Sequence, residues 1–265
     1  MFIFFAITFL FSWILWLPGI LVTYDFIEST STIDTLNDVF KWVAGIGPSL
    51  AGIIIILKSK GKSGLKELFR NVFKFKIGLY YIPLLLILLV TLVAAHLLNI
   101  ILFNASFPAT GLLKEPYWIP VLFIIFYILQ FSEELGWRGY ALEALQRRTN
   151  PLHASIILGS IWALWHLPMF ITEGFGQHDN HLPYAQFFIT LVLISIIITW
   201  FQNKTKGSLV PAFTLHALVN LSGEVLPLIE KNQNTQGNYS AWIILNVILI
   251  LIIIPLVIKK GKNLT

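Results

Sequence analysis

The sequence contains no cysteine, and its charged residues are scarce. Without cysteine, disulfide bonds and thiolate metal sites are excluded. Only 12% of the 265 residues are charged and 57% are hydrophobic, whereas a soluble domain carries about 25% charged residues. The mean hydropathy is +0.79. One soluble core cannot bury this much apolar surface, so the composition predicts a membrane protein with several spans.

The N-terminal stretch has no charged residue before Asp25. It therefore lacks the basic region of a secretory signal peptide, and it also lacks a small-residue cleavage site. It is long enough to cross a bilayer, which takes about 20 apolar residues. We expect it to be a retained transmembrane helix.

Apolar stretches recur along the chain without an internal repeat or a low-complexity segment. We therefore expect one all-α transmembrane domain over residues 1–265, with about eight spans. The expected spans lie near residues 2–24, 42–57, 77–104, 118–145, 153–172, 183–201, 209–226 and 241–258.

The basic residues gather in segments that an even number of spans places on one side of the membrane. Seven lie in 58–76, two follow the fourth span, two follow the sixth and three lie in 259–262, so fourteen of the eighteen Lys and Arg share this side. Positive loops stay in the cytoplasm, which predicts cytoplasmic termini and contact with anionic membrane lipids. No basic folded face remains for nucleic acid, despite the net charge of +5.

Three charged residues, Glu133, Glu134 and Arg138, lie inside the fourth span, where a charge costs about 2.5–3.5 kcal/mol. Glu134 and Arg138 are four residues apart with the acid first, the favourable order for a helical ion pair, and we expect this pair to stabilise the site. Glu133 points to another face and has no helical counter-charge. Loss of water in an apolar cavity would make its carboxylate a stronger base, as general-base catalysis requires.

Histidine and asparagine side chains occupy later spans. His166 lies in the fifth span, and Pro168 is expected to kink the helix beside it. His216 and Asn220 share one face of the seventh span, where they could stabilise an oxyanion, bind a metal or brace a neighbouring helix. Together with Glu133, these side chains are expected to meet in the middle to cytoplasmic half of the membrane.

The other histidines and three tryptophans have simpler interpretations. A membrane histidine usually donates a hydrogen bond between helices, which we expect of His96. Histidines at a span end or in an outer loop are expected to be solvated or interfacial: His153, His178 and His181. Three tryptophans are expected to pack or to line a cavity: Trp137, Trp162 and Trp165.

Three motifs stand in order on separate expected spans. EELGWR (133–138) fits Glu-Glu-x-x-x-Arg, WALWH (162–166) fits an aromatic-x-x-x-His motif, and HALVN (216–220) fits His-x-x-x-Asn. Over residues 131–220 the chain thereby resembles the CAAX-protease and bacteriocin-processing family of intramembrane proteases, which includes the Ras-converting CAAX endopeptidases. The second motif usually begins with Phe, and Trp162 stands there in this sequence.

The resemblance implies an eight-helix core around a cavity open to the cytosol. It implies an endopeptidase that cuts near the C-terminus of a lipidated, CaaX-like or membrane-associated protein or peptide. It assigns the activation of water to Glu133 and His166, and the oxyanion site to His216 and Asn220.

A metal site is the alternative reading of the same residues. No His-Glu-x-x-His motif is present. Glu133, His166 and His216 nevertheless provide two histidines and a carboxylate, which is a donor set of catalytic zinc. We expect catalysis without a cofactor, and zinc held by these three residues is the alternative.

Two other functions would use the same features. Prokaryotic members of the family are often linked to bacteriocin self-immunity, so a non-catalytic immunity or scaffold protein of the same fold is the main alternative. A proton relay in a transporter or channel is a third, although no inverted repeat or pair of broken helices supports it. The frequent Ile, Lys and Asn indicate a bacterial cell membrane as the location.

Overall fold

The computed structural model describes residues 1–75, 78–107, 110–229, 239–260 and 264. All regular secondary structure in these ranges is helical, which confirms the all-α prediction. Residues 76 and 77 and the 261–262 part of the basic C-terminal segment lie outside the described residues.

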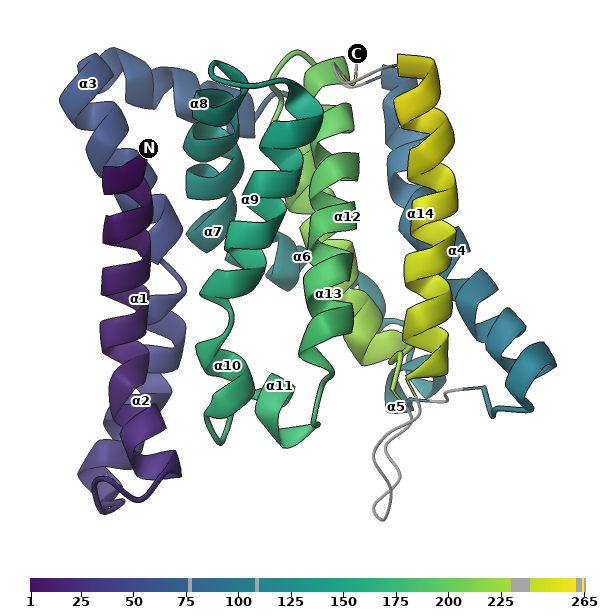
Figure 1. The fold of residues 1–265 in the computed structure, drawn as a ribbon, viewed down its shortest axis with the longest axis horizontal. Helices are drawn as coiled ribbons and strands as arrows, with labels where there is room; N and C mark the ends of the chain where they lie inside the picture. Colours follow the sequence, from purple (N-terminus) through teal and green to yellow (C-terminus); the bar gives the residue numbers. More distant parts are fainter. Residues whose placement is uncertain (76–77, 108–109, 230–238, 261–263, 265) are drawn as a thin grey trace.

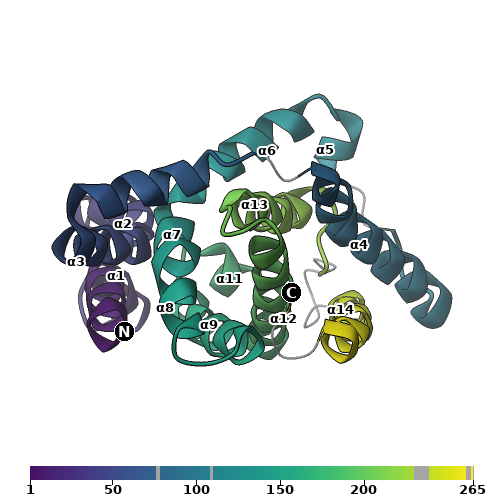
Figure 2. The same cartoon turned by 90° about the horizontal axis from the view of Figure 1, so that it is seen from above.

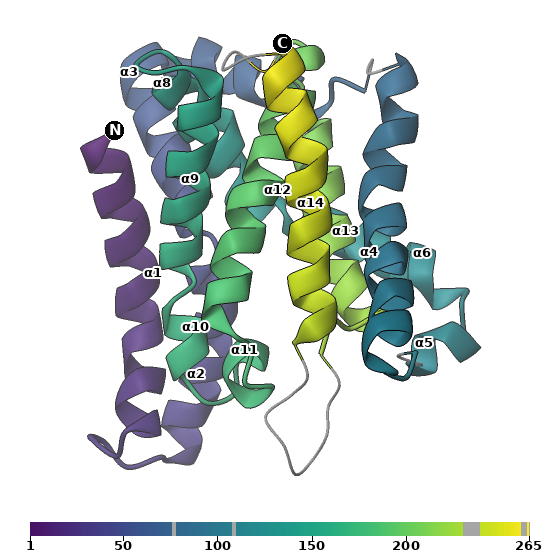
Figure 3. The same ribbon diagram turned by 45° about the vertical axis from the view of Figure 1, so that its right-hand side comes forward.

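Five long helices run side by side through the molecule (Figures 1 and 3). They are α1 (Phe2–Thr23), α4 (Tyr81–Phe103), α9 (Pro151–Trp165), α12 (Tyr184–Lys204) and α14 (Ser240–Lys260). A broken run adds α6 (Trp118–Leu129), α7 (Phe131–Gly136), the π-helical segment η2 (Trp137–Ala141) and α8 (Leu142–Gln146). The remaining helices are α2 (Ser31–Ala44), α3 (Gly47–Val72), η1 (Gly78–Tyr80), α5 (Gly111–Lys114), α10 (Pro168–Ile171), α11 (Gly176–Asp179) and α13 (Val210–Val225).

Long apolar helices support several membrane spans. Among the described residues, six helical runs are long and apolar enough to cross a membrane, or seven if α2 and α3, which are bent by 49°, count as one span. The chain is thus a multi-pass membrane protein, and the expected number of about eight spans stays a prediction. The seventh expected span corresponds to α13, whose 16 residues extend about 24 Å, compared with a hydrocarbon core of about 30 Å.

The two ends of the helix bundle carry different parts of the chain. Both termini, the second half of α3, the α8–α9 connection and the end of α12 lie toward one end, whereas α10, α11 and the α1–α2 connection lie at the other (Figure 1). The basic segments belong to the first group, as the charge pattern predicts. Their placement on the cytoplasmic side stays a prediction.

A kink at Gly61 turns the second half of α3 across the end of the bundle, toward α6 (Figure 2). Gly61 has a φ of +61°, a conformation that glycine adopts without steric cost. Beyond the kink, Leu68 and Val72 are buried in a cluster with Leu135 and Phe213. The kinked half of α3 therefore covers one end of α7 and α13, the two helices that carry most of the site.

The first half of α3 packs so closely on α7 that the backbones of the two helices are in contact. Ser49 Oγ donates a hydrogen bond to the Phe131 carbonyl (2.8 Å) and accepts one from the Gly136 N–H (3.3 Å). A Cβ atom on Gly136 would lie 2.0 Å from the Pro48 carbonyl oxygen. Small residues at such contacts let membrane helices approach closely, and here they fix the position of α7.

The variant Gly136→Ala is expected to be strongly destabilised, by about 3 kcal/mol or more in the free energy of unfolding, because α3 and α7 must separate to admit the methyl group. Unfolding in detergent micelles would measure this. Gly223→Ala in α13 is the matched control, since nothing lies within 4 Å of its added Cβ, and it should be neutral or stabilising by up to about 1 kcal/mol. Equal stability of the two variants would contradict the close packing.

Candidate active site

The first motif lies on a distorted stretch of helix. The helical run breaks at Gln130, between α6 and α7, and widens into the π-helical segment η2. Such π turns are frequent at functional sites because they redirect side chains. Inside the wide turn, the Arg138 carbonyl accepts a hydrogen bond from Gln202 Nε2 of α12 (3.1 Å). The distortion is thus held by a neighbouring helix.

Glu134 links Arg138 and His216 in the interior. Arg138 Nη1 donates to Glu134 Oε1 at 2.9 Å, and both side chains are almost fully buried, with 0% and 1% exposed. This confirms the expected ion pair. His216 Nδ1 of α13 also lies 2.8 Å from Glu134 Oε1; since a carboxylate only accepts, Nδ1 is the donor. Helical spacing could not predict this second contact, because the two residues are 82 positions apart.

Glu133 has a different environment from its neighbour. Its side chain is half-buried, and Oε2 accepts a hydrogen bond from the indole N–H of Trp162 (2.8 Å). In the described part of the chain it takes part in no ion pair. The predicted difference between the two glutamates is therefore present in the geometry.

His166 stands where α9 ends. Helix α9 stops at Trp165 and α10 begins at Pro168, which confirms the expected break. His166 Nδ1 lies 2.8 Å from the Trp162 carbonyl oxygen. A carbonyl cannot donate, so Nδ1 carries the hydrogen and a neutral imidazole keeps its lone pair on Nε2.

The indole of Trp162 lies at the centre of these groups. Its ring centroid is 4.9 Å from that of His216 and 5.8 Å from that of His166, both in edge-to-face arrangements. The Arg138 guanidinium lies 4.2 Å above the same ring. The structure thus brings Glu133, His166 and His216 around one side chain. Sequence reasoning assigned Trp162 to packing or to the lining of a cavity. It did not use the fact that Trp, unlike the usual Phe of this motif, has an N–H that can donate a hydrogen bond.

Two other predicted site residues lie apart from this group. Asn220 is exposed, one turn beyond His216 on α13, and its side chain makes no hydrogen bond to the described residues. Trp137 is fully buried and packs edge-on against Phe4 and Trp165, at 5.6 and 6.0 Å between ring centroids. Asn220 therefore stands at the exposed end of the His216 face, and Trp137 is part of the core.

The remaining histidines lie outside the site. His96 is buried, and its Nε2 lies 3.4 Å from the Leu226 carbonyl oxygen, which confirms a contact between helices. His153 and His181 are exposed, and His178 lies beside Asp179.

The three residues of the alternative zinc site are not grouped as metal ligands in the described part of the chain. Within the ranges that the structure describes, no three His, Asp or Glu side chains are grouped so that they could hold an ion. The Trp162 indole instead contacts all three candidates and occupies one oxygen of Glu133. The arrangement of Glu133, His166 and His216 is set by the protein's own hydrogen bonds.

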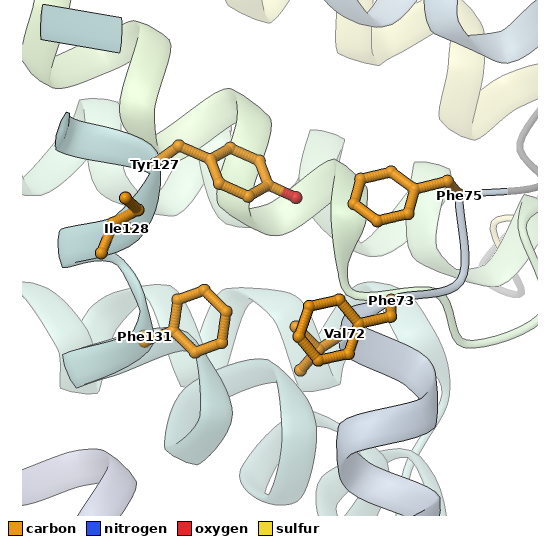
Figure 4. Close-up of a pocket in the computed structure, with 6 residues that line it drawn as sticks. All are labelled: Val72, Phe73, Phe75, Tyr127, Ile128 and Phe131. Atoms are coloured by element: carbon orange, nitrogen blue, oxygen red, sulfur yellow. The ribbon is translucent and has the colours of Figure 1, made fainter. Parts of the chain in front are cut away.

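An apolar pocket of about 450 Å³ lies next to the α6–α7 break. Figure 4 shows its walls, which come from the end of α3 on one side and from α6 and α7 on the other. The lining residues are Val72, Phe73, Phe75, Tyr127, Ile128 and Phe131. Phe131 and Tyr127 also stack on Phe213 of α13, at 4.7 and 5.5 Å between ring centroids. The pocket thus shares α7 with the charged site, and two of its lining residues pack against α13.

Comparison with known proteins identifies the family of this chain. Residues 115–222 match the family model described as type II CAAX prenyl endopeptidase Rce1-like. CAAX prenyl protease 2 of Methanococcus maripaludis is 30% identical over 240 residues, which covers 87% of this chain and 86% of that protein. The chain belongs to the Rce1-like CAAX prenyl endopeptidase family.

Membership in this peptidase family confirms the resemblance seen in the three motifs. The matched segment of this Rce1-like chain contains all of the site residues described above. Lysostaphin resistance protein A of Staphylococcus haemolyticus is also similar, with 25% identity over 188 residues, which covers 68% of this chain and 47% of that protein.

Proposed function

We propose that this Rce1-like chain is an intramembrane endopeptidase that hydrolyses a peptide bond near the C-terminus of a lipidated or membrane-associated protein or peptide. In this proposal Glu133 and His166 activate a water molecule, while His216 and Asn220 stabilise the oxyanion. The observation that carries the proposal is that the two histidines have different partners at Nδ1. The partner of His166 is a backbone carbonyl, and that of His216 is a carboxylate.

The partner of each Nδ1 favours a different role for each ring. His166 donates to a neutral carbonyl, which suits a neutral imidazole whose Nε2 accepts a hydrogen from water. His216 donates to the Glu134 carboxylate, which stabilises an imidazolium whose Nε2–H can donate to an oxyanion. With that imidazolium, Glu133, Glu134, Arg138 and His216 carry no net charge, an advantage in a medium of low dielectric.

The reaction follows from these roles. Glu133 removes a proton from a water molecule that donates its other hydrogen to His166 Nε2, and the water oxygen bonds to the peptide carbonyl carbon. The charge that develops on the carbonyl oxygen is stabilised by donors on His216 and Asn220. Breaking the C–N bond then releases the amine, which takes the proton from Glu133. One water is consumed, and a carboxyl group and an amine are formed.

The apolar pocket supports a lipidated substrate. Its volume of about 450 Å³ lies within the range of about 300–1,000 Å³ that ligand pockets occupy. Its lining side chains are aromatic and aliphatic, and one of them, Phe131, lies two residues before Glu133 in the chain. The name of the similar Methanococcus protein, CAAX prenyl protease 2, points to the same class of substrate.

Cleavage by the reconstituted protein tests the proposal. In liposomes, the wild-type protein is expected to release a C-terminal fragment from a farnesylated peptide with a CaaX end, detected by mass spectrometry. The same peptide without its lipid is expected to be cleaved less efficiently, because it cannot bury an apolar group. Intact peptides after incubation with folded protein would contradict the endopeptidase.

A non-catalytic resistance protein is the second candidate, and the likeness to lysostaphin resistance protein A favours it. The double variant Glu133→Gln, His166→Ala separates the two candidates in lysostaphin-sensitive cells that express the chain. Resistance that survives in the double variant would support the non-catalytic role. Loss of resistance in the folded double variant would support the peptidase.

A further inference from the structure

Trp162 contacts four polar residues of the site through its indole N–H, its carbonyl and its ring. Its N–H donates to Glu133, its carbonyl accepts from His166, and its ring contacts Arg138 and His216. We infer that Trp162 is a positioning residue that holds the Glu133 carboxylate and the His166 imidazole in the orientations that water activation needs. The inference rests on the proposed function and adds to it a residue that touches no reacting atom.

The indole N–H sets the direction of the Glu133 carboxylate. Trp162 is 3% exposed, and an indole nitrogen can only donate. Burying a donor without an acceptor costs free energy, and Glu133 Oε2 accepts the hydrogen bond of this donor at 2.8 Å. Because Glu133 forms no ion pair in the described part of the chain, the Trp162 hydrogen bond is the contact that we expect to orient its carboxylate.

The backbone of Trp162 fixes His166 independently of the indole. The last carbonyls of a helix have no partner inside the helix, and the Trp162 carbonyl on the final turn of α9 receives the His166 Nδ1 hydrogen instead. A substitution of the Trp162 side chain leaves this acceptor in place. The effect of the indole N–H on Glu133 can therefore be measured separately.

Hydrogen bonding and packing at Trp162 can also be separated. An aromatic analogue of the same shape keeps the faces and edges that meet Arg138 and His216. Trp165 provides a matched comparison on the same helix, because it is fully buried and its Nε1 has no hydrogen-bond partner among the described residues. Removing its N–H changes no hydrogen bond.

Benzothienylalanine, which has the shape of tryptophan with sulfur in place of N–H, tests the inference. At position 162 it is expected to lower kcat for the farnesylated peptide by about 10- to 100-fold with KM unchanged, because a misplaced catalytic group slows the chemical step. Trp162→Phe should act in the same direction. At position 165 the analogue should leave kcat at the wild-type value. Wild-type kcat with the analogue at 162, or equal losses at 162 and 165, would overturn the inference.

A second measurement does not depend on activity. In protein labelled with ¹⁵N-tryptophan, the indole signal of Trp162, assigned from Trp162→Phe, is expected to shift in Glu133→Gln and to stay in place in Glu143→Gln, whose side chain is exposed. If the wild-type protein cleaves no peptide, the proposed function is wrong. If the indole signal of Trp162 does not shift in Glu133→Gln, the positioning contact is wrong as well.

Discussion

The Glu133→Gln variant is expected to lose hydrolysis by at least about 10²- to 10⁴-fold, the usual contribution of a general base, while it keeps its folded structure. Glutamine retains the shape of the side chain and can still accept the Trp162 N–H hydrogen bond through its amide oxygen. It cannot take a proton from water. Turnover of the farnesylated peptide and the unfolding transition in detergent micelles, measured on one preparation, would check both halves of this expectation.

Glu143→Gln is the matched control for this prediction. Glu143 lies on α8, in the same helical run, but it is about half exposed and pairs with Arg147 at the surface. Exposed ion pairs contribute about 1 kcal/mol or less, so activity and stability should both stay near the wild type. Full activity in Glu133→Gln would show that the carboxylate is not the base and would remove the core of the proposed mechanism.

The Glu134→Gln variant is expected to lose about 3–5 kcal/mol of stability, because it leaves Arg138 charged and buried without its counter-ion. Activity should fall as well, since His216 loses the carboxylate that accepts its Nδ1 hydrogen. Chemical unfolding in mixed micelles measures the first effect, and peptide turnover measures the second. Glu133→Gln should show only the second.

The double variant Glu134→Gln, Arg138→Met provides the internal control. Removing both members of a buried ion pair costs less than removing one, because the guanidinium is no longer left without its counter-ion. Its loss of stability should therefore be smaller than that of Glu134→Gln alone, with no recovery of activity. If Glu133→Gln and Glu134→Gln behave alike in both assays, the division of labour between the two glutamates is wrong.

Local spacing accounts for what sequence reasoning predicted correctly in the site. The ion pair of Glu134 with Arg138 follows from four-residue spacing on one helix, and the end of α9 before Pro168 follows from the missing N–H of proline. Both effects act within one turn of helix. Neither needs knowledge of what packs against that helix.

Contacts between distant parts of the chain account for what was missed. The bond from His216 to Glu134 joins α13 to α7, and that from Trp162 to Glu133 joins α9 to α7. Helical spacing could place each residue on a face, but not two faces against each other. Hydropathy likewise did not show that the helix in the seventh expected span, α13, is only 16 residues long.

The sequence by itself determined that this protein is helical, crosses a membrane several times, belongs by its motifs to a protease family, and carries an acidic residue without a helical partner. These properties depend on composition and on spacing within single helices. Only the tertiary structure decided that Glu134 serves both Arg138 and His216 and that Trp162 holds Glu133. The reason is physical: a buried donor takes the acceptor that packing brings within reach, and packing joins residues that the sequence keeps far apart.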